Sequence, residues 1–139
     1  MQKNSSEIAV LYWLFVNIFM VFSMIFIGGV TRLTDSGLSM IDWNLIKGIV
    51  PPLNESQWIE KFDDYKMFPE FKIYNSDMEI DEFKKIFFWE YLHRVWGRLI
   101  GLTFLIPLFY FYFTKKITKK TSKYLFFVTL VGFFQAFMG

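Results

Sequence analysis

The 139-residue chain contains no cysteine. This absence excludes disulfide bonds, thiolate metal sites and cysteine nucleophiles. The formal net charge is only +2, which is too small to indicate a nucleic-acid partner. The first apolar run lacks a strongly basic leader and a small-residue cleavage site, so it indicates a retained membrane span and not a secretory signal peptide.

Three long stretches of the chain carry no Asp, Glu, Lys or Arg. They are Ile8–Val30 with 23 residues, Leu99–Thr114 with 16 and Tyr124–Gly139 with 16. A 23-residue helix rises about 35 Å, which is enough to cross a hydrocarbon core of about 30 Å. The sequence therefore predicts an all-α integral membrane protein and excludes a soluble domain.

Polarity divides the chain into six segments. We expect a cytoplasmic tail at 1–7, a first transmembrane helix at 8–30, an outer loop with short interfacial helices at 31–85, a second transmembrane helix at 86–114, a basic cytoplasmic hairpin at 115–123 and a third transmembrane helix at 124–139. Sixteen residues of helix reach only about 24 Å. We therefore expect two complete spans and a truncated third, as the N-terminal fragment of a larger helical bundle.

Charge in the loops predicts the orientation of the spans. The hairpin at 115–123 carries five lysines and no acid, whereas the loop at 31–85 has seven basic and eleven acidic residues. Lys and Arg accumulate in short cytoplasmic loops. We therefore place the N-terminus and the hairpin on the cytoplasmic or matrix side and the loop on the periplasmic or intermembrane-space side.

Two capping signals predict helices inside the outer loop. Asn54 with Gln57 resembles a capping box, and Ser76 with Glu79 forms a second one. After the first signal, aromatic residues recur at helical spacing: Trp58, Phe62 and Tyr65. This pattern predicts an amphipathic helix suited to lying on the membrane surface.

The candidate site lies at the start of the second span, around the only histidine of the chain, His93. Ionisable groups inside a span usually face a bundle interior or a cavity. Residues three or four apart share a helix face, so Glu90, His93 and Gly97 line up. An imidazole above a glycine leaves room for a flat macrocycle, which makes His93 the best candidate for an axial haem ligand. The guanidinium groups of Arg94 and Arg98 suit haem propionates.

The same residues also admit structural interpretations. His93 can form a hydrogen bond to another helix, and Glu90 with Arg94 can form a local i, i+4 ion pair. Arg98 can extend its charged end to the membrane interface. Gly97 with Gly101 can serve close helix packing. The pattern alone leaves these alternatives open.

Several motifs, in order, resemble the haem A synthase family, in its cysteine-free mitochondrial and alphaproteobacterial branch. They are Gly28–Met40, Trp43, Gly48–Leu53, Pro69–Glu70, Asn75, Met78, Glu82–Ile86, and Glu90–Arg94 followed by Gly97–Arg98. The resemblance implies eight spans in two four-helix halves. It implies oxidation of the C8 methyl group of haem O to a formyl group, which gives haem A for cytochrome oxidase.

The resemblance also implies roles for individual residues. Glu90 would be the catalytic carboxylate, and His93 would bind the iron of the substrate haem. Arg94 belongs to the motif, and we assign Arg94, Arg98 and Gly97 to the haem-binding set on their charge and spacing. The resemblance implies that haem b would occupy the missing C-terminal half. Because a bis-histidine site needs a second histidine, we expect this chain alone to be inactive.

The family further implies partners and a location. These are membrane lipid, the farnesyltransferase that makes haem O, an electron acceptor, and the bacterial plasma (inner) or mitochondrial inner membrane. A homo-oligomer is compatible with the sequence. Two other functions remain open at this point: a haem b-binding electron-transfer subunit and a non-catalytic membrane assembly protein.

Overall fold

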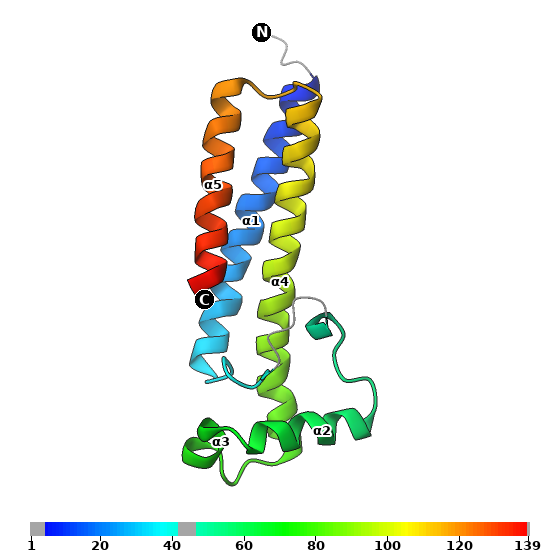
Figure 1. Ribbon diagram of the computed structural model, residues 1–139, viewed down its shortest axis with the longest axis vertical. Helices are drawn as coiled ribbons and strands as arrows, with labels where there is room; N and C mark the ends of the chain where they lie inside the picture. The colour runs from blue at the N-terminus through cyan, green and yellow to red at the C-terminus, as the bar shows by residue number, and fades with distance from the viewer. Residues whose placement is uncertain (1–4, 42–46, 139) are drawn as a thin grey trace. The chain divides into compact units, whose positions relative to one another are not determined.

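The computed structural model describes residues 5–41 and 47–138 (Figure 1). These residues contain helices and no β-strand. In chain order the elements are α1 (Ser5–Leu33), the 3-10 turn η1 (Lys47–Ile49), α2 (Glu55–Lys66), α3 (Pro69–Tyr74), α4 (Ile80–Phe113) and α5 (Lys119–Met138). Trp43, which belongs to the family-like motifs, lies outside the described residues, as do residues 1–4 and Gly139.

Three of the helices are long and apolar enough to cross a membrane. They are α1 with 29 residues, α4 with 34 and α5 with 20. The prediction of an all-α, multi-pass membrane protein is confirmed. Helix α4 begins at Ile80, before the apolar run does, because Asp81 and Glu82 in its first turn interact favourably with the positive end of the helix dipole.

The chain divides into two compact units, one of residues 1–21 and 99–139 and one of residues 22–98. In the first unit, the start of α1 packs against the end of α4. The Trp13 ring lies 5.3 Å from the Phe104 ring and 5.4 Å from the Phe111 ring, between centroids. Leu108 is fully buried in this cluster, and Leu125 of α5 packs against it.

A polar contact within this first unit compensates for a proline in α4. The helix continues through Pro107, which has no N–H, so the carbonyl of Thr103 loses its usual helical donor. Trp13 Nε1 on α1 donates to that carbonyl at 2.8 Å, and Asn17 Nδ2 lies 3.5 Å from it. An unsatisfied carbonyl is costly in a membrane, so the two α1 side chains stabilise the helix at the proline.

The second unit is built on aromatic packing of α2 and α3 against the first turns of α4. Its core residues are Phe62, Tyr65, Phe83 and Phe87, and Trp58 and Phe71 pack against them. The aromatic face of α2 is therefore covered by α4. The position of α2 on the membrane surface stays a prediction.

The structure tests both predicted caps. Asn54 Oδ1 accepts from the Gln57 N–H at 2.9 Å, which confirms the first. The prediction at Ser76 is wrong, because α4 begins at Ile80 and Glu82 Oε2 accepts from the Glu79 N–H instead, at 3.2 Å. Ser76 lies in the turn that follows α3, where the Met78 N–H donates to the Asn75 carbonyl.

Candidate functional site

The C-terminus of α1 turns the chain back toward α4. Asp35 adopts a left-handed conformation with φ of 49°, and the Ser36 N–H donates to the Thr31 carbonyl at 2.9 Å. A left-handed residue followed by this hydrogen bond is a common way to end a helix, and aspartate tolerates the conformation. The turn brings Ser39 and Met40 against the side chain of Glu90.

Glu90 is a buried carboxylate, with 3% of its surface exposed. Its Oε2 accepts hydrogen bonds from the Ser39 hydroxyl and from the Met40 N–H, both at 2.7 Å. Its Oε1 accepts from Arg94 Nη2 at 2.5 Å. Three donors thus surround the carboxylate, an arrangement that suits an ionised, acceptor-only group.

Arg94 connects α4 to the same loop. Its Nη2 donates to the Met40 carbonyl at 2.8 Å as well as to Glu90. The local Glu90–Arg94 ion pair, one of the structural interpretations of the sequence, is therefore present in the fold. The pair also fixes the loop that follows α1 on the surface of α4.

His93 faces α1 and not the loop. A Cβ added to Gly28 would lie 3.2 Å from His93 Nε2 and 3.5 Å from Cδ2, so only a glycine accommodates the ring tip without adjustment. The imidazole is partly buried and makes no hydrogen bond with the described residues. Its nitrogens thus form no hydrogen bond with these residues, and the cross-helix hydrogen bond considered above is not formed with them.

The other predicted residues lie farther along the same helix. Gly97 faces Met24 of α1, whose Cε lies 3.4 Å from the position of an added Cβ. Arg98 reaches η1, with Nη2 3.6 Å from the corresponding position on Gly48. Glycine at position 97 thus serves close packing of α1 and α4 here, and the Arg98 guanidinium points back toward the loop.

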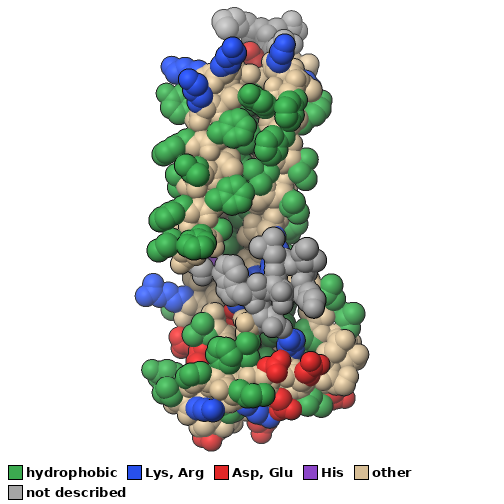
Figure 2. Space-filling view, in the orientation of Figure 1, with side chains coloured by type: hydrophobic (Ala, Val, Ile, Leu, Met, Phe, Trp, Pro, Cys, Tyr) green, Lys and Arg blue, Asp and Glu red, His purple; other side chains and the backbone are tan. Residues whose placement is uncertain are grey.

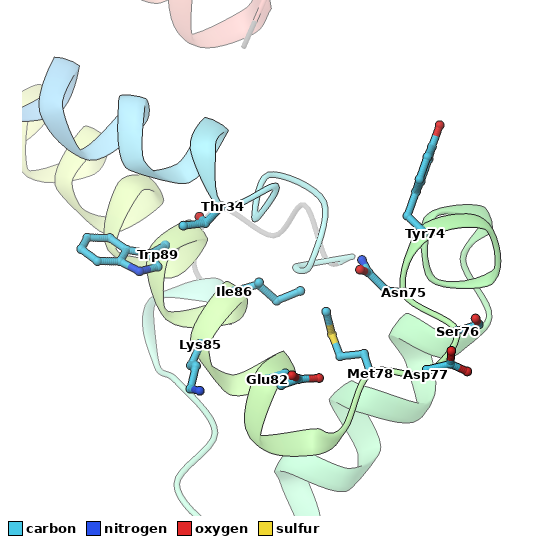
Figure 3. A pocket seen from close by; sticks show the side chains of 10 residues that line it. All are labelled: Thr34, Tyr74, Asn75, Ser76, Asp77, Met78, Glu82, Lys85, Ile86 and Trp89. Carbon is cyan, nitrogen blue, oxygen red and sulfur yellow. The ribbon is translucent and has the colours of Figure 1, made fainter.

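An open cleft of about 750 Å³ lies in the same unit (Figure 3). Ile86 and Trp89 line it from α4, and Thr34 lines it after the end of α1. Trp89 precedes His93 by one helical turn, and the Thr31 hydroxyl lies 3.4 Å from the Trp89 carbonyl. The cleft therefore opens next to the contact of α1 with α4, but neither Glu90 nor His93 lines it.

Glu70 on α3 is a second acidic group with an unusual environment. Its Oε2 is buried and has no hydrogen-bond partner among the described residues. Burial raises the pKa of the Glu70 carboxyl, and the nearby carboxylates of Glu90 and Asp35 raise it further. Glu70 thus lies close enough to Glu90 for the two carboxyl groups to interact.

Three site residues were not singled out by the sequence pattern. Ser39 and Met40 bind a carboxylate 50 or more positions away, and no local periodicity reports such a contact. Gly28 stood next to Gly29 at the end of the predicted first span, but nothing in the pattern told which of the two meets His93. Gly28 has the ring tip next to it, whereas Gly29 has open space.

The fold and the site together define a multi-pass helical membrane protein with a buried carboxylate–guanidinium pair and a histidine one turn away on the same helix. A family model described as cytochrome oxidase assembly protein, COX15-CtaA, matches residues 11–139. The chain belongs to this family.

Curated relatives cover nearly the whole chain. A heme A synthase of Flavobacterium psychrophilum is 45% identical over 100% of this chain and 41% of its own length. Heme A synthase COX15 of Saccharomyces cerevisiae is 44% identical over 99% of this chain and 28% of its own length. A heme A synthase–mitochondrial ferredoxin fusion protein of Schizosaccharomyces pombe is 49% identical over 88% of this chain and 20% of its own length.

The chain thus spans about two fifths, or less, of these relatives. No solved structure matches it.

Proposed function

We propose that the whole protein is a haem A synthase, which oxidises the C8 methyl group of haem O to a formyl group. The observation that carries the proposal is the buried Glu90 one turn before His93, in a chain 45% identical to a relative named heme A synthase. The proposed site residues other than Gly97 carry polar side chains that can bind iron, pair with a propionate or accept a proton.

His93 is the proposed iron ligand of the substrate haem. Its imidazole makes no hydrogen bond with the described residues, and neutral imidazole binds haem iron well. Its tip lies against Gly28 in the contact of α1 with α4, so binding requires the ring to turn out of that contact. When bound, haem would supply redox chemistry at its iron.

Glu90 is the proposed catalytic carboxylate. Removal of two electrons and a proton from the methyl group, with the electrons passing to an electron acceptor, would leave an electron-poor carbon to which water adds with release of a second proton. A fixed carboxylate beside that carbon stabilises the developing positive charge and accepts a proton from the water at Oε1 or Oε2. The Ser39 and Arg94 contacts hold the group in place, which is the preorganisation that such a role needs.

Arg94, Arg98 and Gly97 form the remainder of the proposed haem-binding set. Arg94 holds Glu90 and the Met40 carbonyl through Nη2, and we assign it to a propionate because a guanidinium group suits a carboxylate. The Arg98 guanidinium extends toward Gly48 in η1. The small surface of Gly97 lets a ligand approach α4 closely if Met24 moves.

The reaction also needs electron transfer and a supply of haem O. One relative is named as a fusion to a mitochondrial ferredoxin, and ferredoxins carry electrons. This supports our proposal that the whole protein exchanges electrons with a small carrier protein. We propose the farnesyltransferase that makes haem O as the second partner and haem b as the cofactor of the other half.

The lysine-rich turn between α4 and α5 supports the proposed orientation. With lysines on the cytoplasmic or matrix side, the loop that binds Glu90 faces the periplasm or the intermembrane space. We place the protein in the bacterial plasma membrane or the mitochondrial inner membrane.

The direct test uses the full-length protein in a host that makes haem O but lacks its own haem A synthase. We expect extracted haem to contain haem A, identified by chromatography and mass spectrometry. Purified protein that holds only haem b would favour an electron-transfer subunit instead. Protein without any haem absorption band would favour an assembly role without catalysis, and either result would contradict the proposal.

A further inference from the structure

The turn between α4 and α5 concentrates positive charge. We call Lys115, Lys116, Lys119, Lys120 and Lys123 the lysine cluster. All five side chains are exposed, and no acidic residue occurs between Thr114 and Gly139. Figure 2 shows blue side chains gathered beyond the apolar surface of the long helices. The described residues of this unit contain one acid, Glu7, which leaves most of the cluster charge unbalanced.

Most of the cluster has no protein partner among the described residues. Lys116 is the exception, since its Nζ donates to the Tyr110 hydroxyl at 3.0 Å and lies 4.7 Å from the centre of that ring. The other four lysines form no ion pair or hydrogen bond there through their side chains. In the other unit, by contrast, Lys61, Lys66 and Lys84 each pair with an aspartate.

The N-terminus of α5 makes this charge more costly. Lys119 and Lys120 lie in its first turn, which contains no acid. The positive end of the helix dipole repels cations at this position and attracts anions. The Thr118 side chain accepts from the Thr121 N–H at 3.1 Å. The N–H groups of Lys119 and Lys120, in the same first turn, have no side-chain cap among the described residues. An anion bound at this end would offset both the mutual repulsion of the lysines and their repulsion by the helix dipole.

Exposed tyrosines place the cluster at the level of lipid headgroups. Tyr110, Tyr112 and Tyr124 are 52%, 45% and 63% exposed, on the last turns of α4 and the first turns of α5. Tyrosines are enriched where a membrane span meets water. Since Lys116 contacts Tyr110, the lysines lie at the same interface, where phospholipid phosphates are the most abundant anions.

We propose that the lysine cluster binds the phosphate groups of anionic phospholipids and anchors the α4–α5 turn to the membrane surface. Basic groups next to a membrane span bind anionic lipid through the surface potential and through direct contacts with the phosphates. The inference uses the charge and position of the cluster and does not depend on the proposed oxidation of haem.

The test measures lipid retention by the full-length protein. Protein purified from mixed phosphatidylglycerol and phosphatidylcholine vesicles is analysed by native mass spectrometry. We expect phosphatidylglycerol to be retained over phosphatidylcholine, and the triple variant K119Q/K120Q/K123Q to retain at least about two-fold less of it. The matched control K61Q/K66Q/K84Q removes three lysines that already have carboxylate partners and should retain the wild-type amount.

A charge-preserving variant separates binding from folding. K119R/K120R/K123R should retain phosphatidylglycerol as the wild type does, even if the glutamine variant is poorly folded. Equal retention by the glutamine variant and the wild type would overturn the proposal. So would complete displacement of the lipid by millimolar inorganic phosphate, which would show a simple anion site and not a lipid site.

Discussion

At the scale of single residues, the candidate site depends on how α4 presents two neighbouring side chains. Glu90 is held by the loop after α1, whereas His93 rests against α1 itself. One group is thus fixed by three hydrogen bonds, and the other is free of them among the described residues. This asymmetry suits a carboxylate that must stay in place and a ligand that must move to meet its substrate.

The contact of His93 with Gly28 gives a prediction that needs no haem. Alanine normally stabilises a helix over glycine by about 1 kcal/mol. We expect G29A, where the added Cβ meets open space, to approach that gain in reversible unfolding from mixed micelles. G28A should gain less or lose stability, because its Cβ would lie 3.2 Å from the ring. Equal gains for both variants would show that the ring does not occupy this position.

Glu70 gives a prediction of pH dependence. Because its pKa is raised in the folded state, the folded protein holds this proton more tightly than the unfolded chain does. Its contribution to stability is therefore present at low pH and is lost as the pH rises through the raised pKa. We expect E70Q to be more stable than the wild type above neutral pH and to lose this advantage near about pH 4.

Thermal unfolding of the full-length protein across this pH range checks the expectation. The exposed Glu60 on α2 provides the control, since E60Q should follow the wild-type pH profile. An E70Q profile parallel to that of the wild type would contradict the raised pKa of Glu70.

At the scale of elements, the hydrogen bond from Trp13 on α1 to the Thr103 carbonyl on α4 replaces the donor that Pro107 lacks. A double-mutant cycle measures its contribution to stability. W13F removes the donor to the Thr103 carbonyl together with some packing, while P107A restores the missing helical N–H. We expect W13F to cost about 1 kcal/mol more in the wild type than in the P107A background. The difference isolates the hydrogen bond, because the packing loss is common to both. Equal costs would show that the carbonyl does not need Trp13.

The sequence predicted the long helices well because a long uncharged run that crosses a membrane must satisfy its own backbone hydrogen bonds, which a helix does. It predicted the cap at Asn54 because that signal is local, with donor and acceptor three residues apart. It failed at Ser76, where the turn closing α3 competes for the same residues. A local capping signal thus predicts the start of a helix only when its residues do not belong to a neighbouring turn.

The candidate site was predictable in composition but not in contacts. The spacing of Glu90, His93 and Arg94 on one helix was enough to select them. Their partners Ser39, Met40 and Gly28 come from elements distant in sequence and are fixed by how α1 ends and packs. The sequence aligned Gly97 with His93 on one helix but did not indicate that Gly28 of α1 lies at the ring tip.

At the scale of the whole molecule, a continuous relationship to the cytochrome oxidase assembly proteins covers residues 11–139. The chain spans 41% or less of the three relatives described above, so the proposed reaction belongs to the whole protein and not to these residues alone. In this proposal the chain contributes His93, the buried Glu90 and the loop that fixes Glu90 in place.

The most direct test of this account is the E90Q variant of the full-length protein, which keeps the size of the side chain and removes its charge. E60Q, the same substitution at an exposed carboxylate on α2, is the matched control and should retain wild-type activity. We expect E90Q to bind haem O with a normal absorption spectrum while its haem A yield falls at least about 100-fold, as for a lost catalytic group. Normal haem A yield in E90Q, measured by chromatography of extracted haem, would contradict the catalytic role of Glu90.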